Sequence, residues 1–213
     1  MYSIVMTTIF GIIYLLFLMF SIKERQLSRN FLRPVLIGFF FASLVTFPLV
    51  SMIGGITSYN YPETFLSSFV LVPLVEESSK LLGIFLSFYL LKKFFKTNNQ
   101  MTVRMGGGVG LSFGILEAFT YIFFSSANFM DILERILVSV PGHMSMAMFL
   151  ALGLTQKSKV SAISFISLGY ILHSLSNMLS FSNHLLQGIV FWSILISLFL
   201  LLSKIPYTIE VHC

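Results

Sequence analysis

The sequence has few of the residues that mark soluble domains. Of its 213 residues only 10% are charged and one is a cysteine, whereas a soluble domain carries about 25% charged residues. The single cysteine, Cys213, excludes an internal disulfide and a zinc cluster built from several cysteines. The low charge excludes an ordinary cytosolic enzyme, and the high apolar content excludes a disordered chain.

What the chain has instead is apolar side chains, which make up 56% of it and include 24 phenylalanines. One core cannot bury this much apolar surface, so a bilayer must be the solvent for most of the chain. A spanning helix needs about 20 mostly apolar residues. The sequence therefore predicts an all-α polytopic membrane protein, a bundle of about seven transmembrane helices. The predicted spans are roughly 2–22, 34–54, 65–91, 105–126, 132–154, 160–181 and 185–203.

Lysine and arginine lie in every second loop between these spans. This alternation follows the positive-inside rule, so the N-terminus is predicted outside and the C-terminus in the cytoplasm. The net charge of +5 is accounted for by these loops, and no nucleic-acid partner is expected. The predicted cytoplasmic basic residues are Lys23, Arg25, Arg29, Arg33, Lys92, Lys93, Lys96, Arg104, Lys157, Lys159 and Lys204.

The chain is expected to form a single transmembrane domain over residues 1–213. No second domain, long linker or repeat array is visible in the sequence. The first apolar run has no basic flank and no cleavage site of small residues, so we expect a retained anchor and not a signal peptide. The bilayer is the expected environment, and the sequence leaves the oligomeric state open.

A few ionisable residues fall inside the predicted spans, where a central charge costs a few kcal/mol and marks a functional site by default. Two of them, Glu134 and Arg135, lie a turn from the outer boundary and are expected to snorkel to the headgroups. The others lie deeper and on four different spans, at similar depth, which indicates one shared polar site. These deeper residues are Glu76, Glu77, Lys80, Glu117, His143 and His173.

Spacing groups these residues further. Residues four apart share a helical face, which pairs Glu76 with Lys80 and His173 with Asn177. Pro73 and Pro141 precede two of the polar positions, and proline inside a span frees a backbone carbonyl. Each pattern also has a plain structural interpretation, an interhelical ion pair or hydrogen bond.

Three glycines form a stripe that ends one turn before Glu117. Such a bare stripe lets another helix approach closely. Packing is its expected role, and nothing around it is typical of a phosphate loop. The glycines are Gly106, Gly110 and Gly114.

Four motifs, in order along about residues 65–180, resemble those of the PrsW-type intramembrane proteases. PLVEESSK resembles the EExxK motif, FGILE the FxxxE motif, PGHMSMA supplies a histidine, and HSLSN resembles HxxxN. Relatives in the CAAX protease, Abi and CPBP superfamily show EExxxR and FxxxH, but Leu81 and Glu117 occupy those positions here. The matching residues are Glu76, Glu77, Lys80, Phe113, Glu117, His143, His173 and Asn177.

This resemblance implies proteolysis of membrane-anchored proteins. The family role it suggests is cleavage of anti-sigma factors on their extracytoplasmic side, so the implied partner is a single-pass membrane protein. The implied location is a bacterial plasma membrane. The sequence does not identify the substrate or the scissile bond.

The residues support a glutamate-driven mechanism, in which Glu76 or Glu77 activates a water as general base. We favour Glu76, the first glutamate of the motif. His143, His173 and Asn177 are candidate donors to the developing oxyanion. Glu117 is expected to orient the water or a histidine, and Lys80 to balance the buried charge.

A zinc mechanism with the same residues is the alternative. His143, His173 and a carboxylate from Glu76 or Glu117 would make a three-ligand site with one open position. No HExxH motif occurs, so we favour the version without metal. A non-enzyme, either an ion-coupled transporter or a membrane scaffold, is the remaining alternative, because intramembrane Glu, Lys and His residues also build proton relays.

Overall fold

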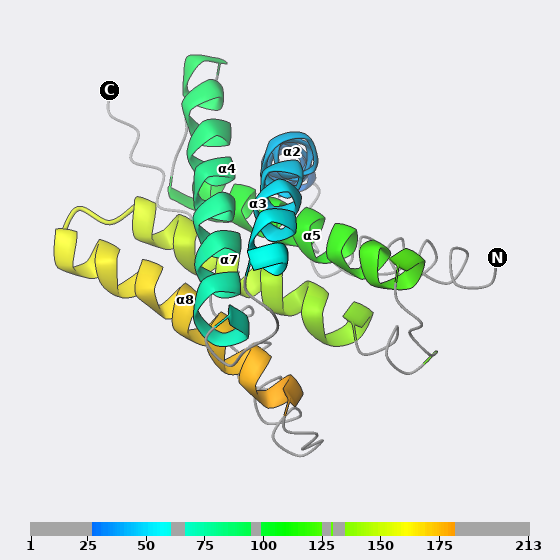
Figure 1. The fold of residues 1–213 in the computed structure, drawn as a ribbon. Helices are drawn as coiled ribbons and strands as arrows, with labels where there is room; N and C mark the ends of the chain where they lie inside the picture. Colours follow the sequence, from blue (N-terminus) through cyan, green and yellow to red (C-terminus); the bar gives the residue numbers. More distant parts are fainter. Residues whose placement is uncertain (1–26, 61–66, 95–98, 125–128, 130–134, 182–213) are drawn as a thin grey trace, which may run out of the picture.

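The computed structural model describes residues 27–60, 67–94, 99–124, 129 and 135–181, and all regular structure in these residues is helical (Figure 1). The all-α prediction is therefore confirmed. In chain order the elements are α2 Leu27–Phe41, η1 Ala42–Thr46, α3 Phe47–Asn60, η2 Ser67–Leu71, α4 Val72–Phe94, α5 Asn99–Phe124, η3 Arg135–Ser139, α7 Val140–Leu154 and α8 Lys159–Phe181.

The three η segments are π-helical, and each ends two residues before a proline. The prolines are Pro48, Pro73 and Pro141. Proline cannot donate the i→i−4 hydrogen bond, and its ring clashes with the carbonyl at that position. A wider π turn accommodates both effects without ending the helix. Two of the three turns directly precede the polar residues of α4 and α7.

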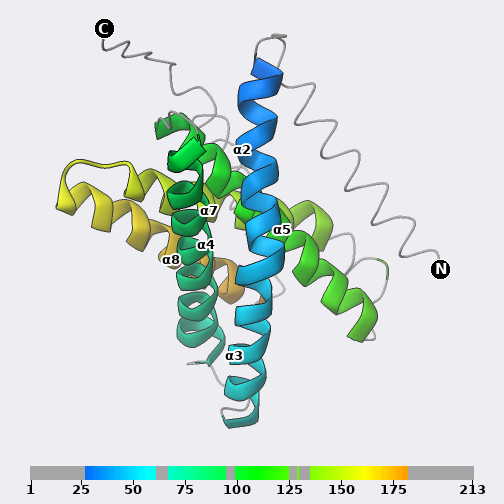
Figure 2. The same cartoon turned by 90° about the horizontal axis from the view of Figure 1, so that it is seen from above.

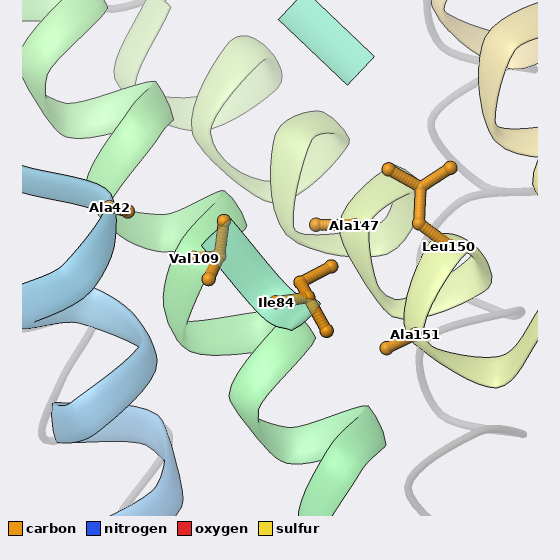
Figure 3. Close-up of a cluster of buried hydrophobic side chains, with 6 residues drawn as sticks. All are labelled: Ala42, Ile84, Val109, Ala147, Leu150 and Ala151. Atoms are coloured by element: carbon orange, nitrogen blue, oxygen red, sulfur yellow. The ribbon is translucent and has the colours of Figure 1, made fainter. Parts of the chain in front are cut away.

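The helices pack as a rod, a hairpin and a central helix. Helices α2 and α3 join through η1 into one rod, which runs beside α4 (Figure 2). Helices α7 and α8 form a hairpin closed by Thr155–Ser158 (Figure 1). Helix α5 packs against both α2 and α7. Four elements, η1, α4, α5 and α7, meet in one apolar cluster (Figure 3), formed by Ala42, Ile84, Val109, Ala147, Leu150 and Ala151.

The glycine stripe of α5 lies against the backbone of α7. A Cβ at Gly110 would overlap the carbonyl oxygen of His143, and one at Gly114 would lie 2.7 Å from Cα of Val140. At Gly106 an added Cβ would lie 2.6 Å from the backbone of α7. Contacts this short are possible only without side chains. The stripe therefore brings α7 close to α5, as the sequence predicted.

Among the described residues, two helical stretches are long and apolar enough to cross a membrane, Pro34–Ile53 and Asn99–Ile122. They overlap the predicted spans 34–54 and 105–126. Val140–Leu154 is a shorter apolar helix. The predicted spans 2–22 and 185–203 lie outside the described residues. The number of seven spans and the orientation of the termini stay predictions.

The predicted spans 65–91 and 160–181 are helical along their described parts but are more polar. Helix α4 carries Glu76, Glu77 and Lys80 in its first half, and α8 carries several serines besides His173. Charged and polar groups lower the hydropathy of the helices that bring functional residues to one site.

Candidate active site

Four helices bring the predicted polar residues into one connected cluster. Helix α4 provides Glu76, Glu77 and Lys80, α5 provides Glu117, and α7 and α8 provide one histidine each. Glu77 and Lys80 have no exposed surface, and both histidines are at most 5% exposed. The residues that the cluster brings together are Glu76, Glu77, Lys80, Glu117, His143 and His173.

Lys80 lies at the centre of this cluster. Its Nζ donates to Oε1 of Glu77 at 2.5 Å and to Nδ1 of His143 at 2.7 Å, and it lies 4.4 Å from the centroid of the Phe113 ring. The sequence pattern paired Lys80 with Glu76, but Oε2 of Glu76 is 3.9 Å away. A fully buried ammonium requires such a paired environment, so Lys80 joins α4 to α7 through its side chain.

The hydrogen bonds of His143 determine which ring nitrogen carries the proton. An ammonium only donates, so Nδ1 of His143 accepts from Lys80. The proton of the neutral ring is then on Nε2, which donates to Oε2 of Glu117 at 2.6 Å. Both nitrogens of His143 are therefore engaged.

His173 has the opposite arrangement. Its Nδ1 lies 2.6 Å from Oε1 of Glu77, a carboxylate oxygen that accepts, so Nδ1 carries the proton. Its Nε2 has the free electron pair and faces Oε2 of Glu76 at 3.7 Å. The rings of His143 and His173 meet edge to face, with centroids 5.3 Å apart. His173 is thus the histidine whose basic nitrogen is directed at a carboxylate.

The two adjacent glutamates differ in their surroundings. Glu77 is wholly buried between Lys80 and His173. Glu76 is 9% exposed, and its Oε2 makes no hydrogen bond within the described part of the chain. A buried oxygen without a partner is costly unless a ligand or the reaction requires it. Oε2 of Glu77 also makes no hydrogen bond among the described residues, but of the two side chains only that of Glu76 is partly exposed, and its Oε2 is the one that faces Nε2 of His173.

Glu117 accepts three hydrogen bonds, two of them from residues that the sequence analysis did not assign to the site. Arg135 donates to Oε1 at 3.0 Å, and Ser139 donates to Oε2 at 3.1 Å beside His143. Arg135 was expected to snorkel to the headgroups, which stays a prediction; its guanidinium contacts Glu117 and the ring of Tyr121, so it also belongs to the site.

Two further residues of the sequence analysis, Glu134 and Asn177, are not among the residues named above as the connected cluster. Glu134 lies outside the described residues. Asn177 lies one turn beyond His173 on α8 and is partly buried, which places it on the helix face that the HxxxN spacing predicted.

The formal charges of the cluster do not cancel. Three carboxylates face the two permanent cations, Lys80 and Arg135, while both histidines in their neutral forms add nothing. One negative charge remains, and a charge in a membrane interior must be compensated. Glu77 binds Lys80 closely and Glu117 binds Arg135, so Glu76 is the carboxylate without a close cation and the one best placed to take up a proton.

The donor set fits a divalent metal in part. One ligand atom each from Glu76, His143 and His173 lie within 4.8 Å of one another. Two histidines and one carboxylate form a ligand set that zinc hydrolases use, and the unbonded oxygen of Glu76 suits a cation. The Nδ1–H bond from His173 to Glu77 is also typical of a metal-binding histidine. His143 joins this set only if Lys80 releases its Nδ1 or Glu117 releases its Nε2.

This cluster, in a strongly apolar and all-helical chain, is typical of intramembrane hydrolases. The comparison with protein families agrees: residues 4–202 match the PrsW family of intramembrane metalloproteases, and the chain belongs to that family. No curated protein and no solved structure matches it. Family membership supports a membrane protease over the transporter and scaffold alternatives.

Proposed function

We propose that this protein is an intramembrane endopeptidase in which Glu76 activates the attacking water. The observation that supports Glu76 is its buried Oε2, which makes no hydrogen bond among the described residues and faces Nε2 of His173 at 3.7 Å. At this separation one water molecule can bind both atoms. Glu77 also has an unbonded oxygen, but it is less suited to act as a base because Lys80 and His173 bind its other oxygen and its side chain has no exposed surface.

The reaction needs one mobile proton. Glu76 takes a proton from the water while the oxygen of the water bonds to the scissile carbonyl carbon. The carbonyl oxygen becomes an oxyanion. Collapse of this intermediate breaks the C–N bond, and the proton moves from Glu76 to the leaving amine, directly or through Nε2 of His173. The products are a new carboxyl group and a new amine.

The remaining residues hold the groups that react. Glu77 fixes the His173 ring so that Nε2 faces Glu76, and Lys80 adds a positive charge near the developing oxyanion. Asn177 is the donor we assign to the oxyanion itself, because its uncharged amide lies on the same face of α8 as His173 and can donate to an oxygen. His143 and Glu117 join α7 to α5 beside this group.

The cluster of donors also favours a zinc-dependent variant of the same function. Glu76, His143 and His173 would hold the ion, with Glu117 as the other candidate carboxylate. Zinc would supply Lewis acidity toward the scissile carbonyl. In this variant Lys80 or Glu117 must leave His143, whereas the glutamate mechanism uses the contacts as they are, so we favour the latter.

We assign the whole chain, residues 1–213, to one multi-pass domain in the plasma membrane of a bacterium, with the motif-bearing core at about 65–180. Membrane-anchored proteins with a single span, such as anti-sigma factors, are the proposed substrates. A helical substrate must unwind before its peptide bond is reachable, because the helical backbone is internally bonded. Cleavage in the juxtamembrane segment outside the bilayer avoids that cost.

The direct test is cleavage of a panel of single-pass proteins in liposomes, with the cut position mapped by mass spectrometry. We expect cleavage within a few residues of the outer boundary of the substrate span. A matched variant, S78A, removes only an exposed hydrogen bond to Tyr170 and is expected to cut normally. Failure to cut any member of the panel, with folded protein, would contradict the proposal.

The proposed orientation has its own test. Phe129 and Ser158 are both exposed and lie in loops predicted on opposite sides of the membrane. With Cys213 replaced by serine, F129C and S158C each carry one thiol. We expect a membrane-impermeant maleimide to label F129C on intact cells and S158C only after permeabilisation. The reverse labelling pattern would show that the orientation is opposite to the proposed one.

A further inference from the structure

Arg135 is the first residue of η3 and is held from two sides by α5. Its Nη1 donates to Oε1 of Glu117 at 3.0 Å, and its guanidinium carbon lies 3.7 Å from the centroid of the Tyr121 ring. Glu117 and Tyr121 are one helical turn apart on the same face of α5. A guanidinium that bonds a carboxylate and stacks on an aromatic ring uses both of its recognition modes.

The residues that bind Glu117 follow one another at intervals of four on η3 and α7. Arg135 binds Oε1, while Ser139 and His143 bind Oε2. The guanidinium therefore takes one oxygen and leaves the other to the hydroxyl and the imidazole. This division fixes the rotation of the carboxylate about its own axis.

The π turn places Arg135 and His143 on the same face of the continuous helix formed by η3 and α7. Eight residues of regular α-helix turn about 80° past two full turns, at about 100° per residue, which would place Arg135 and His143 on different faces. Residues 135–139 are π-helical, and one π turn takes up about one extra residue. The eight-residue step then corresponds to about seven α-helical residues, which end within about 20° of their start.

We propose that Arg135 is a positioning residue of the site: it orients the Glu117 carboxylate so that Oε2 accepts from Nε2 of His143, and this bond, together with Lys80 at Nδ1, holds the ring in one orientation and one tautomer. With the proton held on Nε2, Nδ1 is the acceptor for Lys80, and Lys80 in turn binds Glu77. The effect of Arg135 on catalysis rests on the proposed function, whereas its effect on the ring does not.

The chain of contacts gives the route by which Arg135 acts. From Glu117 it passes through His143, Lys80 and Glu77 to His173. In each of these hydrogen bonds the donor and the acceptor are identified. Without Arg135, Oε1 of Glu117 loses the one side-chain donor it has within the described residues, and the carboxylate is free to turn away from His143.

The test is a ¹⁵N NMR spectrum of the histidine rings in the full protein, reconstituted in lipid nanodiscs and labelled at histidine. An H143N variant assigns the His143 signals. In the native protein we expect separate signals for a protonated Nε2 and an unprotonated Nδ1. In R135M we expect these two signals to move toward a common average, because a Glu117 carboxylate that turns away from Nε2 lets the ring leave Lys80 and exchange between tautomers. R135K, which keeps the charge, is expected to retain the native pattern.

Controls separate positioning from general loss of structure. K159M removes an exposed cation of α8 and is expected to leave the spectrum native. R135Q removes the charge but keeps an uncharged donor, and it replaces R135M in the test if R135M fails to fold. We expect a partial shift of the His143 signals in R135Q. Native His143 signals in folded R135M or R135Q would overturn the proposal.

A second readout uses the panel of single-pass substrates. We expect R135M to lower kcat by about 10- to 100-fold, the range for lost outer-shell partners, with KM changed less than twofold. Because Arg135 acts through Glu117, E117Q/R135M should lose no more than E117Q alone. A fully additive double variant would overturn the proposal. If no substrate is cut but the NMR result holds, the proposed function fails and the positioning role stands.

Discussion

Nζ of Lys80 lies 2.7 Å from Nδ1 of His143 and thereby occupies one of the two ring nitrogens that could bind a metal ion. The same ammonium lies 2.5 Å from Oε1 of Glu77. The centre of the site thus holds a positive charge that belongs to the protein itself. A divalent ion entering beside it is repelled, and Coulomb repulsion at such distances is strong when water is scarce.

This contact predicts the metal content of the purified protein. We expect wild-type protein prepared without chelators to hold much less than one zinc per chain by mass spectrometry. K80M, which frees Nδ1 of His143 and removes the like charge, should bind zinc about 10-fold or more tightly. Stoichiometric zinc in the wild type that is lost in both H143N and H173N would establish the metal-dependent variant instead.

The buried pair of Lys80 and Glu77 predicts an asymmetry in stability. K80M leaves the Glu77 carboxylate buried without its ammonium, and breaking a buried pair in this way costs about 3–5 kcal/mol. K80M/E77Q removes both charges and should recover a substantial part of this loss. The measurement is the free energy of unfolding in micelles. Equal stability of K80M and the wild type would show that the pair is not buried as described.

Two glycines one turn apart on α5 predict different effects of a substitution by alanine on stability. In G110A the new methyl group overlaps the carbonyl oxygen of His143, backbone that cannot move independently, and overpacking costs about 1–3 kcal/mol. In G107A the methyl group lies 3.6 Å from the flexible side chain of Met148, so we expect no loss.

The measurement is thermal unfolding of both glycine variants in the same lipid, in which G110A should melt at a lower temperature than G107A. G110A should also lose proteolysis, since α7 carries His143, whereas G107A should cut normally. An equal effect of the two substitutions would contradict the packing of α5 on α7.

Much of the site was predictable because a bilayer makes ionisable residues conspicuous. A charge within an apolar span is costly, so Glu76, Glu117, His143 and His173 stand out from their surroundings, and their similar depth on four spans indicated one cluster. The structure brings these four residues together. The all-helical architecture and the close approach at the glycine stripe followed from composition and spacing in the same way.

The details that the sequence did not reveal depend on local helix geometry. The i, i+4 rule paired Lys80 with Glu76, and this ion pair is present at 3.9 Å, but the ammonium binds Glu77, three residues earlier, more closely and also donates to His143. Arg135 was expected at the headgroups because it lies a turn from the predicted outer boundary, and regular α-helical periodicity would also have turned it away from His143. The π turn before Pro141 removes that rotation, and the proline is the sequence signal that would have indicated it.

The most direct test of the account is proteolysis by E76Q, an isosteric change that removes the proposed base. Wild type, E76Q and S78A would be reconstituted at equal amounts with a single-pass substrate that the wild type cuts, and the rate of product formation measured. The account predicts that E76Q loses activity by about 10²–10⁴-fold, the contribution typical of a general base, while its melting temperature stays close to that of S78A. Cleavage by folded E76Q at the wild-type rate would contradict the assignment of Glu76 as the base.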